Sequence, residues 1–265
     1  MRFLFLGDIV GAPGVAFVRK AVPRLRLSEQ LDFVIANAEN ATNGSGLSPK
    51  DYRLLKAAGI DAFTLGDHIY KKFDIAEVLN NPVEPISKPA NYPAASPGRD
   101  HVLLSIHETS VALISVMGRT YMRSVDCPFA AVDRVLATIG NQARIIIVDI
   151  HAEATADKYQ MAHHLNGRVT AVLGTHTHVQ TADEQILSGS TAFLCDVGMC
   201  GPYDSILGRR IDRVLHTAIT FEPTAFDVAT GDVRLAGAIV DVNPETGKAT
   251  AIRRMMLRES DLPGV

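Results

Sequence analysis

Five short apolar runs along this chain each end in residues that can bind a metal or transfer a proton. The runs are FLFLGD, FVIANAEN, AFTLGDH, IIIVDIH and AVLGTHTH. An uninterrupted apolar run of this length is typical of a strand buried on both faces. In open α/β sheets, ligands bind just beyond the carboxyl ends of such strands. The pattern therefore predicts that these side chains converge: Asp8, Glu39, Asn40, Asp67, His68, His151, His176 and His178.

The first third of the chain is predicted to alternate strands with helices. A helix over Val15–Leu27 contains Pro23, where it would kink or split. Ser48 and Pro49 form a helix start signal, and Gly59 is a C-terminal signal after Ala58. The remaining predicted elements here are strands over Arg2–Leu6, Phe33–Asn37 and Ala62–Leu65, and a short helix over Asp74–Leu79.

Later segments predict a second group of strands. Five prolines within Asn81–Gly98 indicate an irregular connection. A hairpin is expected over Val102–Ile106 and Val111–Val116, then helices over Phe129–Ile139 and Ala156–His164 that alternate with strands over Arg144–Ile150 and Val169–Gly174. Short strands follow over Glu184–Leu187, Ala192–Leu194, Thr217–Glu222, Val233–Val242 and Ala249–Met256. This order predicts an α/β fold of two packed sheets with helices outside, in a single domain over residues 1–265.

Composition narrows the classes of function. The 265 residues carry a formal net charge of −3, and the basic residues are scattered, so there is no strong nucleic-acid signature. No run is long enough to span a bilayer, and the N-terminus lacks a secretory signal, so a cytoplasmic protein without membrane contact is expected. A small anionic substrate remains compatible with this charge. The oligomeric state is not fixed by the sequence, and a homo-oligomer stays open.

Two other features do not indicate chemistry. The segment GDIVGAPG lacks the G-x-G-x-x-G spacing of a dinucleotide site, and Pro13 removes a backbone N–H that a phosphate cradle needs. Cys127, Cys195 and Cys200 lack the paired spacing of a zinc or redox motif. We expect all three to be buried thiols of a protein kept in a reducing compartment.

The residue types at the strand ends point to metal chemistry. In an extended segment, residues two apart face the same side, so His176 and His178 are expected to reach one centre. Glu153 could orient a histidine ligand. Mixed imidazole and carboxylate donors suit iron, manganese or zinc better than calcium or magnesium alone. Their number exceeds one coordination sphere and predicts a site for two metals.

The order of these motifs resembles the calcineurin-like metallophosphoesterases. On FLGDIVGAPG, NAENATNGSGL, LGDHIYKK, VDIHAEAT, GTHTHVQTAD and DVGMCGPYDSILG, the chain is similar to the YmdB-type branch up to about residue 208. The resemblance implies a four-layer α/β/β/α sandwich that hydrolyses phosphodiesters, with 2′,3′-cyclic nucleotides as the substrate class. A metal-activated hydroxide would attack the phosphorus in line.

Matching the motifs residue by residue implies a role for each strand-end side chain. Asp8 and His178 would bind the first metal, and Glu39 would bridge both. The second metal would be held by Asn40, Asp67, His151 and His176. His68 would donate a proton to the leaving group. The two metal ions are expected to be iron or manganese, with zinc as a further candidate.

Two departures from the family pattern affect what can be transferred. The broader superfamily opens with Asp-x-His, whereas Ile9 and Val10 follow Asp8, as in the YmdB-type branch. That branch usually has Gly-Asn-His where this chain has Gly66, Asp67 and His68. The added negative charge is expected to tighten metal binding and weaken the Lewis acid.

Three alternatives and one group of weaker contacts stay open. A phosphomonoesterase or an amidohydrolase is conceivable, although amidohydrolases carry His-x-His on the first strand. A metal-bearing regulatory protein that binds a nucleotide or partner without turnover is the alternative from another class. Arg119, Asn91 and the loop Gly201–Gly208 are candidates for contacting the phosphate or base.

Overall fold

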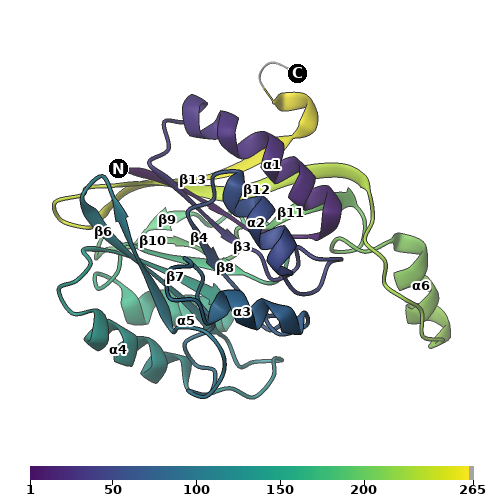
Figure 1. Ribbon diagram of the computed structural model, residues 1–265, viewed down its shortest axis with the longest axis horizontal. Helices are drawn as coiled ribbons and strands as arrows, with labels where there is room; N and C mark the ends of the chain where they lie inside the picture. The colour runs from purple at the N-terminus through teal and green to yellow at the C-terminus, as the bar shows by residue number, and fades with distance from the viewer. Residues whose placement is uncertain (263–265) are drawn as a thin grey trace.

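The computed structural model describes residues 1–262 and contains two mixed β-sheets (Figure 1). In the first sheet the strand order is β2-β11-β12-β1-β3-β4, and β13 pairs with β12. Strands β1, β3 and β4 are parallel, whereas β12 runs antiparallel to β1, β11 and β13. The strand bounds are β1 Arg2–Leu6, β2 Asp8–Ile9, β3 Phe33–Asn37, β4 Ala62–Thr64, β11 Met199–Asp204, β12 Gly231–Val242 and β13 Ala249–Arg258.

The second sheet has the strand order β5-β6-β7-β8-β10-β9. Its central strands β6, β7, β8 and β10 are parallel, and the two edge strands are antiparallel to their neighbours. Their bounds are β5 His101–Ile106, β6 Thr109–Met117, β7 Ile145–His151, β8 Ala171–Thr175, β9 Gln185–Ile186 and β10 Ala192–Leu194. The hairpin predicted from the sequence is confirmed at β5–β6.

Alternation of side chains along β1 shows how the layers form. Phe3 and Phe5 face the second sheet and pack with its Leu113 and Ile147, whereas Leu4 and Leu6 belong to the core under the helices. Helices α1 (Gly11–Ser28) and α2 (Pro49–Ala57) cover the first sheet, and α4 (Pro128–Ile139) and α5 (Thr155–Leu165) cover the second. The predicted four-layer α/β/β/α sandwich is therefore confirmed.

The helix boundary signals were mostly informative. Ser48 caps α2 by accepting a hydrogen bond from the backbone N–H of Asp51, and Gly59 follows the helix with a φ of 99°. Pro23 lies inside α1, which is one continuous helix, so of the two predicted effects, a kink or a split, the split is wrong. The predicted helix over Asp74–Leu79 is a 3₁₀ turn, Phe73–Ile75, followed by the single α-helical turn α3, Ala76–Leu79.

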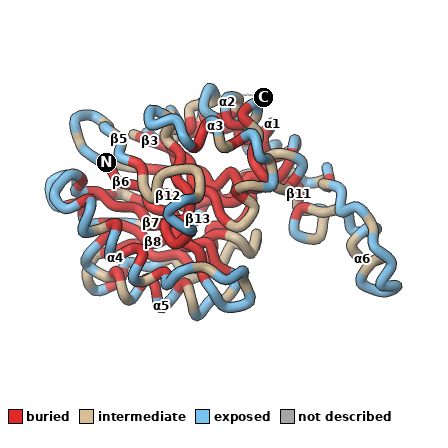
Figure 2. Tube along the Cα trace, turned by 60° about the horizontal axis from the view of Figure 1, so that its bottom comes forward, coloured by how far each residue is buried: buried red, intermediate tan, exposed pale blue. Residues whose placement is uncertain are grey.

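One predicted strand is wrong. Thr217–Glu222 lies largely in helix α6 (Ile211–Thr220), which projects from the sandwich (Figures 1 and 2). None of the residues of α6 is buried, and Leu215 and Ile219 are exposed. The chain returns from this arm into β12. A last 3₁₀ turn, Glu259–Asp261, follows β13. Within the described residues, no helix combines the length and apolar character of a membrane span.

Candidate metal centre

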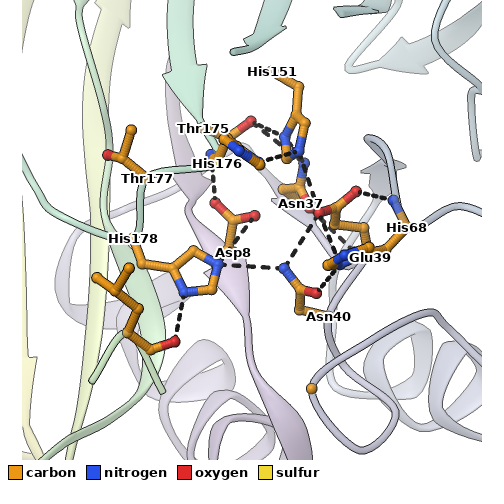
Figure 3. Close-up of polar contacts among 12 residues, drawn as sticks. Asp8, Asn37, Glu39, Asn40, His68, His151, Thr175, His176, Thr177 and His178 are labelled. Carbon is orange, nitrogen blue, oxygen red and sulfur yellow. Dashed lines mark hydrogen bonds and ion pairs between the residues drawn. The ribbon is translucent and has the colours of Figure 1, made fainter. Parts of the chain in front are cut away.

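The carboxyl ends of strands from both sheets meet at one place and carry the predicted side chains, which Figure 3 labels except for Asp67. In the first sheet, Asp8 begins β2 just after β1, Glu39 and Asn40 follow β3, and Asp67 follows β4. In the second sheet, His151 is the last residue of β7, and the two remaining histidines follow β8. The centre therefore spans the junction between the two sheets, and neither sheet alone could build it.

Four ligand atoms form a compact group. One atom each from Glu39, Asp67, His151 and His176 lie within 4.8 Å of one another. His151 Nε2 is 3.2 Å from Glu39 Oε1, 3.2 Å from Asp67 Oδ1 and 3.1 Å from His176 Nδ1. The side chains of Glu39 and His151 are fully buried. Carboxylates and imidazoles at such distances form a donor set that a divalent cation can share.

A second group lies beside the first, around Asp8 and His178. His178 Nε2 is 3.8 Å from Asp8 Oδ1 and 3.3 Å from the amide nitrogen of Asn40. The Asn40 amide oxygen accepts a hydrogen bond from His68 Nδ1 at 2.7 Å, so it faces away from His178. Asn40 thus lies between the two groups, and its role as a ligand of the second metal stays a prediction.

His176 and His178 do not face one centre as the alternation rule predicted. β8 ends at Thr175, and the backbone φ angles of the two histidines are 102° and 64°, so this segment is not an extended strand. The ring of His176 contacts His151, whereas the ring of His178 lies near Asp8 and Asn40 (Figure 3). The two imidazoles are therefore divided between the two groups.

The residues present fit bound cations. Asp8 is fully buried, and its Oδ1 has no hydrogen-bond partner among the described residues. Burial raises the pKa of Asp8 to about 6, although the charges of His178 and His151 act in the opposite direction. An uncompensated buried carboxylate oxygen is costly unless a cation neutralises it. A metal ion held between Asp8 and His178 would remove this penalty.

His151 is oriented by a chain of hydrogen bonds that was not predicted from the sequence. Its Nδ1 donates to Thr175 Oγ1 at 2.8 Å, and that hydroxyl donates to Asp149 Oδ1 at 2.7 Å. The amide of Asn37 donates to the other oxygen of Asp149 at 3.2 Å. This arrangement leaves His151 Nε2 free to face the ligand group. The available signal was that Asp149 lies two residues before His151 and so shares its face of β7.

A cavity of about 280 Å³ opens onto the centre. The strand-end residues Glu39 and His68 line it together with two residues from the segment before the arm, Leu207 and Arg209. The Leu207 carbonyl accepts a hydrogen bond from His178 Nδ1 at 3.0 Å, which directs Nε2 toward Asp8. The loop Gly201–Gly208 thus contributes through a backbone carbonyl, and its first part belongs to β11.

Other candidates from the sequence take different places. Asn91 is buried and bonds the backbone of Met117 and Asp126, so it is structural, and neither it nor Arg119 lines the cavity. Glu153 Oε2 is 3.2 Å from His176 Nε2, in agreement with its predicted orienting role. Cysteines 195 and 200 are buried as predicted, but Cys127 is exposed, so that prediction is wrong for one of the three.

The chain is similar to known proteins over nearly its whole length. A family model described as YmdB-like protein matches residues 4–255. The 2′,3′-cyclic-nucleotide 2′-phosphodiesterase of Bacillus subtilis (strain 168) is 39% identical over 262 residues, covering 99% of each chain. The crystal structure of a hypothetical protein from Thermus thermophilus has a TM-score of 0.92 and 39% identity, covering 98% of this chain and 100% of that one.

A further crystal structure, that of a novel phosphatase from Mycoplasma pneumoniae, has a TM-score of 0.91 and 30% identity, covering 99% of this chain and 95% of that one. Two packed mixed sheets with ligand-type residues at the strand ends define a protein of the calcineurin-like phosphoesterase fold. Within that class, the chain belongs to the YmdB-like family. The family predicted from the sequence motifs is thereby confirmed.

Proposed function

We propose that this chain is a binuclear metal-dependent phosphoesterase that hydrolyses phosphodiesters, with 2′,3′-cyclic nucleotides as its substrate class. The observation that carries the proposal is the convergence of three carboxylates and three imidazoles beside one cavity. The name of the Bacillus subtilis relative supports the substrate class. The mixed donor set supports iron or manganese, and zinc would also fit.

Each ligand has a place in this proposal. Asp8 and His178 would hold one metal ion, and Asp67, His151 and His176 would hold the other. Glu39 would bridge the two, and Asn40 would join the second set by presenting its oxygen. When bound, two such ions supply charge neutralisation for the phosphate and lower the pKa of a coordinated water.

His68 is proposed as the proton donor to the leaving alkoxide. Its backbone N–H donates to Glu39 Oε2 at 3.0 Å, and its ring Nδ1 bonds the Asn40 oxygen, which together fix the imidazole at the cavity. In the protonated ring, the proton at Nε2 is the one available for transfer. General acid catalysis of this kind contributes about 10²–10⁴-fold to a rate.

The test compares His68→Ala with His163→Ala, which changes an exposed histidine on α5 that does not line the cavity. Both proteins are loaded with manganese or iron and assayed on 2′,3′-cyclic AMP, bis-p-nitrophenyl phosphate and p-nitrophenyl phosphate. We expect His68→Ala to keep its metal content and lose about 10²-fold or more in diester turnover. Full turnover in that variant would remove His68 from its role. No turnover by the metal-loaded wild type would instead support a regulatory protein.

A further inference from the structure

The two histidines after β8 have backbone conformations that need support. Both have positive φ, 102° for His176 and 64° for His178, a region that residues with a Cβ rarely adopt. Such conformations persist where the surrounding structure holds them, and they cluster at functional sites. Here the conformation has a visible consequence, because it sends the His176 and His178 rings to different ligand groups.

Thr177, between the two histidines, is held at its backbone N–H and its hydroxyl by one carboxylate. Its backbone N–H donates to Asp196 Oδ2 at 3.1 Å, and its Oγ1 donates to the same oxygen at 2.8 Å. The ring of neither histidine contributes to this contact. Turning the Thr177 peptide would break the first bond and turning its side chain would break the second, so both parts of Thr177 are held against Asp196.

Asp196 is itself held rigidly. It is 1% exposed, and its Oδ2 also accepts a hydrogen bond from Lys158 Nζ at 2.7 Å. The Lys158 side chain, on α5, is equally buried. Oδ1 accepts the backbone N–H of Gly198 at 2.8 Å. Removal of either partner of this buried ion pair would leave a buried charge unpaired.

The same turn reaches Asp8. The Gly198 carbonyl accepts the backbone N–H of Asp8 at 3.1 Å. Gly7 packs so closely against this carbonyl that a Cβ there would lie 2.0 Å from the oxygen. Asp196 is therefore linked through Thr177 to the neighbouring His176 and His178, one in each ligand group. Through Gly198 it is linked to the backbone of Asp8.

We propose that Asp196, with Lys158 as its counter-ion, is a positioning residue that aims His176 and His178 at two separate metal positions and fixes the backbone of Asp8. This inference rests on the proposed binuclear centre. Asp196 touches neither substrate nor metal in this scheme. It acts through Thr177 and Gly198.

The hydroxyl of Thr177 offers a test that leaves the buried ion pair intact. Thr177→Val keeps the shape of the side chain and removes the hydrogen bond, whereas Thr177→Ser keeps the hydroxyl. Thr170→Val is the matched control, because the buried Thr170 hydroxyl also makes two hydrogen bonds, to Gly247 and Ile146, away from the ligand residues. Manganese affinity and stoichiometry are measured by titration calorimetry at a temperature well below unfolding.

We expect Thr177→Val to lose about tenfold or more in manganese affinity, the range found when residues behind metal ligands are changed. Thr177→Ser should bind like the wild type, and Thr170→Val should lower the melting temperature without changing manganese affinity. If Thr177→Val unfolds, Thr177→Ala is scored by the same criterion. Wild-type affinity in both hydroxyl-free variants, or an equal loss in Thr177→Ser, would overturn the positioning role. A wild type that binds no manganese, iron or zinc would overturn the metal centre itself.

Discussion

The negative charge of Asp8 should lower the free energy of unfolding of the metal-free protein and raise that of the metal-loaded protein. Burial raises the pKa of this carboxyl to about 6 from its ordinary 3.8. That difference corresponds to about 3 kcal/mol of lost stability once the group is ionised in the folded chain. The Asp8 carboxyl has a higher pKa in the folded chain than in the unfolded chain, so its protonated form stabilises the fold. This stabilising contribution is fully present at a pH below the unfolded pKa and is lost as the pH rises through about 6.

We therefore expect Asp8→Asn to raise the free energy of unfolding of chelator-treated protein by up to about 3 kcal/mol at pH 8, with little effect at pH 4. The amide oxygen of Asn can still accept the backbone N–H of His176, which Asp8 Oδ2 accepts at 3.0 Å. With manganese the sign should reverse, since the variant lacks a ligand and gains less stability from metal binding.

Urea unfolding with EDTA and with manganese, at several pH values, measures both effects. Asp204→Asn is the control for the loss of a negative charge, because Asp204 is exposed on β11, which pairs with β2. A loss of stability in chelator-treated Asp8→Asn at pH 8 would refute this role of the Asp8 charge. A gain of the same size at pH 4 and pH 8 would refute it as well.

Three further changes test other parts of the structure. Asp67→Asn removes a negative charge from the ligand group, so it should weaken manganese binding by about tenfold or more and shift the pH profile of diester turnover to lower pH. Manganese titrations and pH profiles identical to those of the wild type would show that the charge is irrelevant. Asp157 accepts three hydrogen bonds from Arg119 and Thr120, which outweigh its burial and lower its pKa. The resulting stability is present above the unfolded pKa of about 3.9 and is lost as the pH falls through the folded pKa. Thermal melts at several pH values should therefore show that Asp157→Asn is less stable than the wild type at pH 7 and approaches it in acid. Leu215→Glu on α6 should change the free energy of unfolding by less than about 0.5 kcal/mol, and a larger loss in urea melts would show that the arm packs against another surface.

The ligand residues could be predicted because each lies at or just after the end of a strand with a largely apolar run. Strands β3 and β7 are buried at every residue, and polar side chains gather only at their carboxyl ends: Asn37, Glu39 and Asn40 at β3, and Asp149 and His151 at β7. Parallel strands place such ends at one edge of a sheet. The sequence therefore shows which residues meet, even though Glu39 and His151 lie 112 positions apart and in different sheets.

Two elements without such a run, β11 and α6, were missed or wrongly assigned. β11 contains Gly201 and Pro202, residue types that argue against a strand. Pro202 nevertheless lies opposite Val233 in the antiparallel pair of β11 and β12. The segment around Ile219 is rich in β-branched residues, which favour strands. It is helical on an arm whose side chains remain exposed, so no burial pattern was available to correct the local preference.

The division of ligands between the two groups depends on contacts that no local pattern encodes. A two-residue spacing fixes the faces of His176 and His178 only while the chain is extended, and β8 ends before either residue. Their directions are determined by Asp196, twenty positions after His176, and by the Leu207 carbonyl near the base of the arm. Asp196 acts through the hydrogen bonds that it accepts from the backbone and hydroxyl of Thr177, and the Leu207 carbonyl acts through the one that it accepts from the His178 ring. Neither is marked by a sequence motif. A sequence can thus reveal the ligands of such a centre, while the assignment of each ligand to one metal position follows from tertiary packing behind them.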